Sequence, residues 1–273
     1  MVFWPGFLSG MSSAASIPST RMNALSKHVL VELCAWEYVR ITAKWAPGSS
    51  RWLLLLTVPA TSVLLSLLLY DGADTELWWT LVLGILVLLS VGIGLLLLIT
   101  GTPVEETAAA FGVVGWGTGY FSVAGASLWA LKVIDPWVLL LLLAVVWLGD
   151  SAAFYIGTIF GRHRLAPIVS PKKSWEGAMA NLAASLVAAF GWCWLRLDVL
   201  RWDVVAVAVV ASVVGQMGDL VVSMFKRGAR VKDSGNLLPG HGGMWDRLDA
   251  LLFAAPVMLL GLWLIGFDAN SLP

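Results

Sequence analysis

The sequence is a series of long apolar runs separated by short polar stretches. Seven runs, roughly 52–70, 77–100, 107–131, 136–160, 175–195, 203–224 and 248–267, approach or exceed the ~20 residues with which a helix crosses a ~30 Å hydrocarbon core. Of the 273 residues, 59% are hydrophobic and 12% are charged, about half the charged fraction of an ordinary soluble domain. The pattern predicts an all-α, polytopic transmembrane protein with about seven to eight membrane helices.

The N-terminal part of the chain follows a different pattern. Residues 1–24 lack the basic start and unbroken apolar core of a cleaved signal peptide, and we interpret them as a flexible leader. Residues 25–45 mix apolar and charged side chains, which favours an N-terminal amphipathic segment over a full span. Because no internal repeat or soluble domain is recognisable, we expect residues 25–273 to form a single membrane-embedded domain.

The basic residues are unevenly distributed between the two ends of the expected spans. If the spans alternate in direction, segments 21–51, 101–106, 161–174 and 225–247 share one side and hold fourteen of the seventeen Lys and Arg. Positive charge marks the cytoplasmic side of a membrane protein, so we expect both polar loops, 161–174 and 225–247, to face the cytoplasm. The formal net charge is zero, which gives no indication of a nucleic-acid partner.

The richest polar stretch lies between the last two runs, from Gly218 to Leu251. Asp219, Ser223 and Lys226 are spaced four and then three residues apart, which places them on one face of a helix. A carboxylate inside an apolar span is costly unless it pairs, binds a cation or lines water. The sequence leaves two alternatives for Asp219: a functional site, or a structural salt link to Lys226.

A second acidic cluster opens the last run. Asp246 and Asp249 are three residues apart, and Asp residues at a helix N-terminus can simply cap the helix or complement its dipole. Together with Asp219, however, they form a set of three carboxylates from two helix ends that suits a hard cation. Magnesium is typically held by one or two carboxylates together with phosphate oxygens and water.

A glycine-rich turn, Pro239-Gly240-His241-Gly242-Gly243, lies between the two acidic clusters. Glycines allow backbone N–H groups to approach a phosphate closely, and Lys226, Arg227 and Lys232 lie just upstream. His241 either orients a phosphate or caps the turn.

The other polar loop, residues 161–177, carries Arg162, Arg164, Lys172 and Lys173. These residues either bind anionic lipid head groups or clamp the phosphates of a substrate. Ser174 is suited to start the next helix as its N-cap. Upstream, Asp150 lies inside or near the end of an apolar span and is a further acidic candidate, and the Gly157-x-x-x-Gly161 spacing predicts close helix packing.

These motifs together resemble the phosphatidate cytidylyltransferase (CDP-diacylglycerol synthase) family. The resemblance rests on Ser223-Met-Phe-Lys226-Arg227, on Lys232-Asp233 and on Pro239-Gly-His241-Gly-Gly-Met-Trp-Asp246-Arg247-Leu-Asp249. Asp150-Ser-Ala-Ala-Phe-Tyr-Ile-Gly157 and Ser170-Pro-Lys-Lys-Ser-Trp-Glu-Gly177 resemble two further regions of that family. The similarity covers about residues 100–267, and more loosely the AWEY segment near Trp36.

The resemblance implies an enzyme that condenses CTP with phosphatidate to give CDP-diacylglycerol and pyrophosphate. It also implies magnesium, often with potassium beside it, a homodimer, and a multi-pass protein of the bacterial inner membrane. By motif position, the catalytic group is Asp219, Asp246, Lys226 and Asp249, of which the three Asp residues are metal ligands. The same comparison assigns substrate binding to Asp150, Lys172, Lys173, Ser174, Ser223, Arg227, Lys232, Asp233, Gly240, His241, Gly242 and Arg247.

Two other functions remain open from the sequence. A CTP-dependent polyprenol or phytol kinase would transfer the γ-phosphoryl group to a lipid alcohol and release CDP. An ion-coupled transporter could use Asp150 and Asp219 as a relay, but we find no inverted repeats or broken midplane helices, which are typical of such proteins.

Overall fold

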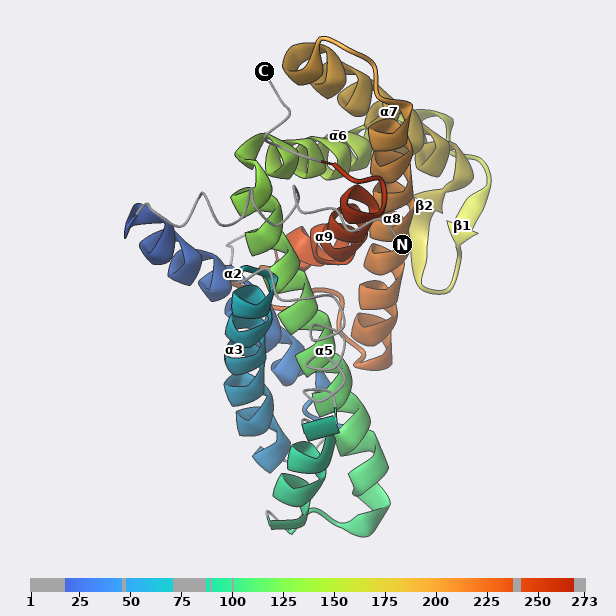
Figure 1. The fold of residues 1–273 in the computed structure, drawn as a ribbon. Coiled ribbons are helices and arrows are strands. Elements are labelled where there is room, and N and C mark those ends of the chain that lie inside the picture. Colours follow the sequence, from blue (N-terminus) through green and yellow to red (C-terminus); the bar gives the residue numbers. More distant parts are fainter. Residues whose placement is uncertain are drawn as a thin grey trace.

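The computed structural model describes residues 18–45, 48–70, 87–88, 90–99, 101–237 and 242–267. Its main elements are α2 (Pro18–Thr42), α3 (Gly48–Tyr70), α5 (Val104–Ile134), α6 (Pro136–Phe160), β1 (Arg164–Ala166), β2 (Ser170–Ser174), α7 (Trp175–Leu197), α8 (Trp202–Gly228) and α9 (Trp245–Leu264) (Figure 1). The helices agree with the predicted α-helical membrane protein. The antiparallel hairpin β1–β2 is an addition, because strands of three and five residues are too short for their periodicity to be recognised in the sequence.

Four described helices, α6, α7, α8 and α9, are long and apolar enough to cross a membrane. Each corresponds to one of the predicted runs, and α6 has the predicted bounds, 136–160. The apolar helical stretches Trp52–Ser66 and Ser90–Ile99 are shorter than a full span. The run expected at 77–100 lies partly outside the described residues, so the described part of the chain accounts for four of the seven predicted spans.

Helix α2 begins at Pro18, inside the range that the sequence assigns to a leader, while residues 1–17 lie outside the described part. In the second half of α2, Val31, Cys34, Ala35 and Tyr38 are buried. They pack in an aromatic cluster with residues of α5, α8 and α9, including Phe121, Phe225 and Trp245. The amphipathic segment expected at 25–45 is therefore an integral part of the bundle in its second half.

Local sequence explains where α6 and α7 begin. Pro136 occupies the first turn of α6, where its missing N–H costs nothing, and the Asp135 side chain accepts a hydrogen bond from the Trp137 N–H at 2.9 Å. As predicted, Ser174 is the N-cap of α7, and its hydroxyl accepts from the Gly177 N–H at 3.1 Å.

The α6–α7 pair packs closely through glycine, as the Gly157-x-x-x-Gly161 spacing predicts. A Cβ on Gly177 would lie 2.9 Å from the Ala153 carbonyl oxygen, and one on Gly157 would lie 3.2 Å from Ser174 Oγ. This contact brings the β2 strand, which immediately precedes α7, against the end of α6.

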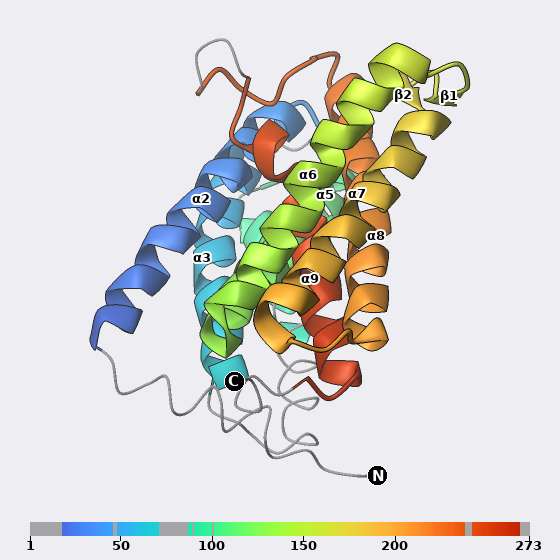
Figure 2. The ribbon, with the colours of Figure 1, turned by 90° about the horizontal axis from the view of Figure 1, so that it is seen from above.

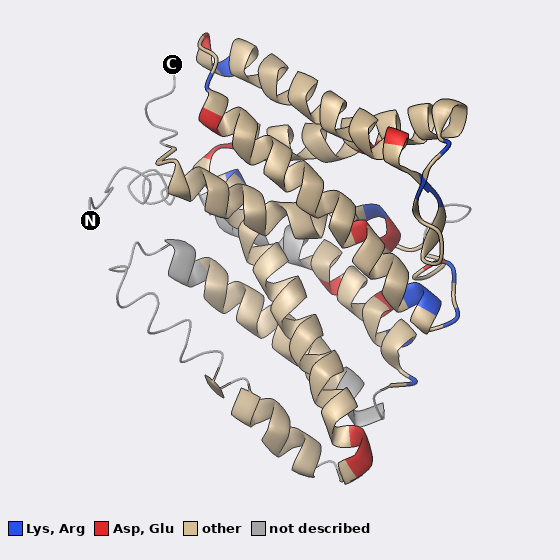
Figure 3. Cartoon of the chain, turned by 90° about the vertical axis from the view of Figure 1, so that its right-hand side faces the viewer, with Lys and Arg blue, Asp and Glu red and all other residues tan. Residues whose placement is uncertain are grey.

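The two polar loops lie at the same end of the bundle. Figure 2 shows the β1–β2 hairpin and the chain that follows α8 on one side of the helices. Lys and Arg residues are found along the hairpin and near the C-terminal end of α8, where Asp and Glu residues also occur (Figure 3). The candidate site is therefore located where four apolar helices meet the polar loops.

Candidate active site

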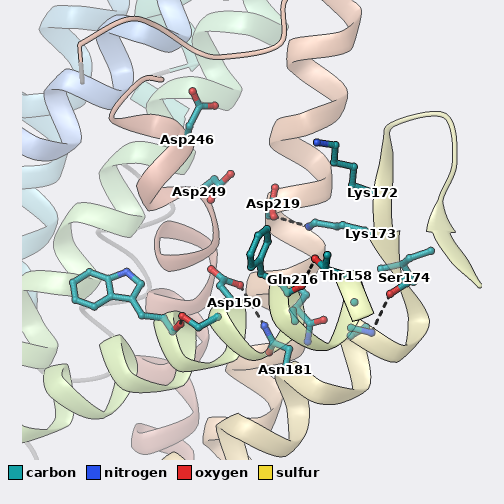
Figure 4. Close-up of a pocket in the computed structure, with 18 of the residues that line it drawn as sticks. Asp150, Thr158, Lys172, Lys173, Ser174, Asn181, Gln216, Asp219, Asp246 and Asp249 are labelled. Atoms are coloured by element: carbon teal, nitrogen blue, oxygen red, sulfur yellow. Dashed lines mark hydrogen bonds and ion pairs between the residues drawn. The ribbon is translucent and has the colours of Figure 1, made fainter. Parts of the chain in front are cut away.

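At this end of the bundle, α6, β2, α7, α8 and α9 enclose a pocket of about 700 Å³ (Figure 4). Its lining includes eight charged side chains: Asp150, Lys172, Lys173, Asp219, Lys226, Asp246, Arg247 and Asp249. All eight were singled out as site candidates by the sequence. Residues from positions 150 to 249 thus meet in one pocket, as expected if both polar loops serve one function.

The ion pairs of the pocket differ from the alternative considered for Asp219. Asp219 Oδ2 lies 2.6 Å from Lys173 Nζ, whereas Lys226 Nζ lies 2.7 Å from Asp246 Oδ1. The alternative of a structural salt link between Asp219 and Lys226 is therefore wrong. Seven residues of α-helix separate two side chains by about 10 Å along the axis, and both find closer partners on neighbouring elements.

The predicted helical face on α8 is present. Ser223 Oγ donates to Asp219 Oδ1 at 3.4 Å, and Lys226, one turn further on, reaches the pocket. Ser223 itself is buried beside the pocket, so its contact with Asp219 is one that orients the carboxylate.

Asp246 is the most extensively hydrogen-bonded carboxylate of the pocket. Its Oδ2 accepts from the backbone N–H groups of Ser234 at 2.7 Å and Gly243 at 2.9 Å, in addition to the Lys226 contact on Oδ1. The N-cap residue, Met244, makes no side-chain capping bond. Asp246 therefore acts partly as a helix cap, because it accepts the Gly243 N–H just before α9. It also forms an ion pair with Lys226 in the pocket.

Asp249 lies one turn further along α9 and is 8% exposed. Its Oδ1 accepts only a local bond, from the Ala250 N–H at 2.8 Å. Figure 4 shows that Asp249 lines the pocket together with Asp219 of α8 and Asp150 of α6. Carboxylates from three helices therefore face one cavity that also holds lysine side chains.

These residues can be tested against a magnesium site. Within the described ranges, no group of three or more His, Cys, Asp and Glu is close enough to hold a metal ion by itself. Magnesium does not require such a cage, because it is usually bound through one or two carboxylates with phosphate oxygens and water. Asp219, Asp246 and Asp249 are the candidates for that role. Both oxygens of Asp219 and of Asp246 are engaged by the protein, so a metal ion would replace the Lys173 or the Lys226 contact.

The hairpin carries the basic part of the pocket. Lys172 and Lys173 lie on β2 and line the cavity, whereas Arg162 and Arg164 are exposed outside it. Arg227 of α8 links the hairpin to the loop after α8. Its Nε donates to the Val169 carbonyl of the hairpin at 3.2 Å, and its Nη1 donates to the Val231 carbonyl of that loop at 3.1 Å.

Several predicted substrate-binding residues do not line the pocket. Arg227 acts on the hairpin, and Lys232 and Asp233 are exposed on the loop after α8. Gly242 has a left-handed backbone with φ of 81°, and a Cβ there would lie 2.9 Å from Asp246 Oδ2. Gly240 and His241 lie outside the described residues.

Four polar residues of the pocket lining, Ser151, Thr158, Asn181 and Gln216, were not predicted as site residues from the sequence, and two of them illustrate the reason. Asn181 of α7 donates to Asp150 Oδ1 at 3.3 Å and accepts from Ser212 Oγ at 2.7 Å, so it orients Asp150. Gln216 lies three residues before Asp219 on α8 and also lines the pocket. Each is a polar residue inside an apolar run, which is the signal that could have identified both.

Comparison with known proteins shows the family of the chain. The model of the cytidylyltransferase family matches residues 4–265. The chain is similar to proteins named phosphatidate cytidylyltransferase, with 41% identity over 115 residues in Staphylococcus saprophyticus, 42% over 115 residues in Staphylococcus haemolyticus and 44% over 133 residues in Haemophilus influenzae.

These alignments cover 42% to 45% of this chain and 44% to 46% of the relatives, so the matched part spans less than half the length of each relative. The family match, in contrast, extends over nearly the whole chain, including the helices that form the pocket. The chain belongs to the cytidylyltransferase family.

Proposed function

We propose that this protein is a membrane-embedded nucleotidyltransferase that condenses CTP with phosphatidate, giving CDP-diacylglycerol and pyrophosphate. The observation that carries the proposal is the pocket itself. Four carboxylates, three lysines and one arginine line a cavity at the end of four apolar helices, where a lipid head group and a water-soluble nucleotide can meet. The names of the similar bacterial proteins point to the same reaction.

The pocket lining offers separate surfaces for the two substrates. On α6, Trp147 and Phe154 line the cavity and are 54% and 67% exposed, so the pocket has an apolar edge on the outer surface of the bundle. Lys172, Lys173 and Arg247 supply positive charge on its polar side. We infer that the phosphatidate head group enters along α6 with its acyl chains in lipid, while the CTP phosphates bind among the basic side chains.

The chemistry needs positioning and charge neutralisation more than acid–base catalysis. A phosphatidate oxygen is already anionic, so it can attack the α-phosphorus of CTP without a strong general base, and pyrophosphate leaves in line. Lys173 and Lys226 each form an ion pair with a carboxylate of the pocket. We expect them to contact phosphate oxygens when substrates bind, which would stabilise the charge that develops in the transition state.

Magnesium is proposed as the cofactor, with Asp219, Asp246 and Asp249 as the residues that would hold it. The bound ion would neutralise nucleotide phosphates and stabilise the leaving group. A potassium ion beside it is part of the same proposal and follows from the family resemblance.

The wider organisation is also proposed. We propose about seven to eight membrane helices, with the hairpin and the loop after α8 on the cytoplasmic side of a bacterial inner membrane. The excess of Lys and Arg at that end supports this orientation. A homodimer is proposed from the family resemblance alone.

The proposal is tested with purified protein, phosphatidate, magnesium and labelled CTP. We expect CDP-diacylglycerol and pyrophosphate in equal amounts, and we expect Asp219→Asn to lower kcat by at least ~100-fold because preorganised charge in the site is lost. Asp203→Asn is the matched control, since Asp203 lies on the same helix and pairs with Arg201 outside the pocket. Normal synthesis by Asp219→Asn would contradict the assignment.

A further inference from the structure

Glu37 of α2 is a buried carboxylate that contacts the active-site loop from outside the pocket. It is 2% exposed and accepts three hydrogen bonds, from Ser234 Oγ at 2.6 Å and from the backbone N–H groups of Met244 and Trp245 at 2.9 Å each. Among the described residues, no Lys or Arg forms an ion pair with it. A buried carboxylate is costly unless it is compensated, so these three bonds hold it firmly in place.

These contacts place Glu37 at the N-terminus of α9. The first N–H groups of a helix have no intrahelical partner, and Met244, the N-cap residue, provides no side-chain acceptor. Glu37 supplies the missing acceptor from a different helix, about two hundred residues earlier in the chain, and its negative charge complements the helix dipole.

Glu37 and Asp246 hold the same two pieces of chain. Ser234 donates its hydroxyl to Glu37 and its backbone N–H to Asp246, and the Gly243–Trp245 segment likewise donates to both carboxylates. Ser234 and the Gly243–Trp245 segment are thus held together by two carboxylates, Glu37 of α2 and Asp246 of α9. Movement of Glu37 would therefore shift Asp246 and its partner Lys226, both of which line the pocket.

Two glycines allow this close approach. A Cβ on Gly235 would lie 2.6 Å from Glu37 Oε1, and a Cβ on Gly243 would overlap both Ser234 Oγ and Glu37 Oε2. Any other residue at either position would therefore disturb the contact between the loop and the Glu37 carboxylate. Gly235 and Gly243 therefore lie against the two oxygens of the Glu37 carboxylate, one glycine at each oxygen.

We propose that Glu37 is a positioning residue for the pocket: by holding Ser234, Met244 and Trp245 it fixes the place of Asp246 and Lys226. The proposal rests on the nucleotidyltransferase function for its effect on turnover, but the contact with the loop can be measured independently. Glu37 does not line the pocket, so its proposed role is exerted through the residues that it holds.

The test compares Glu37→Gln with Ser234→Ala, the double variant and a matched control, Glu32→Gln, on the same helix. A Gln side chain presents an NH₂ group to one of the donors, so at least one contact becomes repulsive. We expect kcat to fall ~100-fold, the scale of a ~1 Å misplacement in an active site, with little change in the KM for CTP. Ser234→Ala should give a smaller loss, and the double variant should resemble Glu37→Gln alone because both act through one contact.

Amide hydrogen exchange of the 231–245 segment gives the second measurement. We expect faster exchange there in Glu37→Gln, unchanged exchange in α6 and α7, and no effect of Glu32→Gln. Wild-type kcat in folded Glu37→Gln, or lost turnover with unchanged exchange in 231–245, would overturn the proposal. If Glu37→Gln does not fold, the proposal is tested with Ser234→Ala instead. An unchanged kcat together with unchanged amide exchange in Ser234→Ala would overturn the proposal. If the wild-type protein makes no CDP-diacylglycerol, the proposed function fails, while the exchange measurement still decides whether Glu37 holds the loop.

Discussion

The two Lys–Asp pairs of the pocket are expected to contribute unequally to the free energy of unfolding. Their lengths are nearly equal, 2.7 Å for Lys226–Asp246 and 2.6 Å for Lys173–Asp219. Their environments differ, because the side chains of the first pair are each 10% exposed while those of the second are 27% and 29% exposed. Replacing each lysine by Met keeps an unbranched side chain and removes the charge.

Lys226→Met leaves a buried Asp246 without its counter-ion, a change that typically costs ~3–5 kcal/mol. We expect the lower end of that range, because Asp246 retains the N–H groups of Ser234 and Gly243 as donors. Lys173→Met should cost no more than ~1 kcal/mol, since a partly exposed pair is screened by water.

The assay is the free energy of unfolding in mixed detergent micelles, measured by denaturing-detergent titration for the wild type and both variants. A double variant, Lys226→Met with Asp246→Asn, should recover part of the loss because it removes the uncompensated charge. Equal costs for the two lysine variants would refute the argument that burial, and not pair length, decides their contributions.

Three further predictions follow from packing, orientation and cofactor. Gly177→Val should destabilise the α6–α7 pair by ~1–3 kcal/mol in the same titration, because even a Cβ would lie 2.9 Å from the Ala153 carbonyl; a neutral result would contradict the close packing. Cysteine at Ile168, which is 92% exposed in the hairpin, should react with a membrane-impermeant thiol reagent only from the cytoplasmic face, and cysteine at Asp198 only from the other face, while buried Cys34 and Cys193 stay inert; the opposite labelling would reverse the proposed orientation. Removal of divalent cations with a chelator should abolish turnover and added magnesium should restore it, whereas full activity in the chelator would exclude the proposed cofactor.

The helices that carry the pocket could be predicted from the sequence because their signals are local. A long apolar run with a single charged residue, Asp150, indicated α6. Pro136 and Ser174 indicated helix starts, and the Gly157 spacing indicated the α6–α7 contact. The number of spans was less predictable, since a run of apolar residues does not show how much of it forms a regular helix.

The candidate residues could be predicted, but their partners could not. Lys226 shares a helical face with Asp219, yet it pairs with Asp246, because the packing of α9 against α8 brings that carboxylate closer. Glu37 was missed for the same reason: its donors at positions 234, 244 and 245 are distant in sequence, and only the folded bundle brings them to α2. Pairing across helices depends on tertiary packing, which has no local signal.

Nucleotidyl transfer and phosphoryl transfer are distinguished by following the phosphorus atoms of CTP into the products. Purified protein is incubated with phosphatidate, magnesium and CTP labelled in separate reactions at the α- or the γ-phosphorus. Nucleotidyl transfer predicts that the α label appears in the lipid product and the γ label in pyrophosphate. Appearance of the γ label in the lipid, with release of CDP, would instead show a lipid kinase and contradict the proposed function.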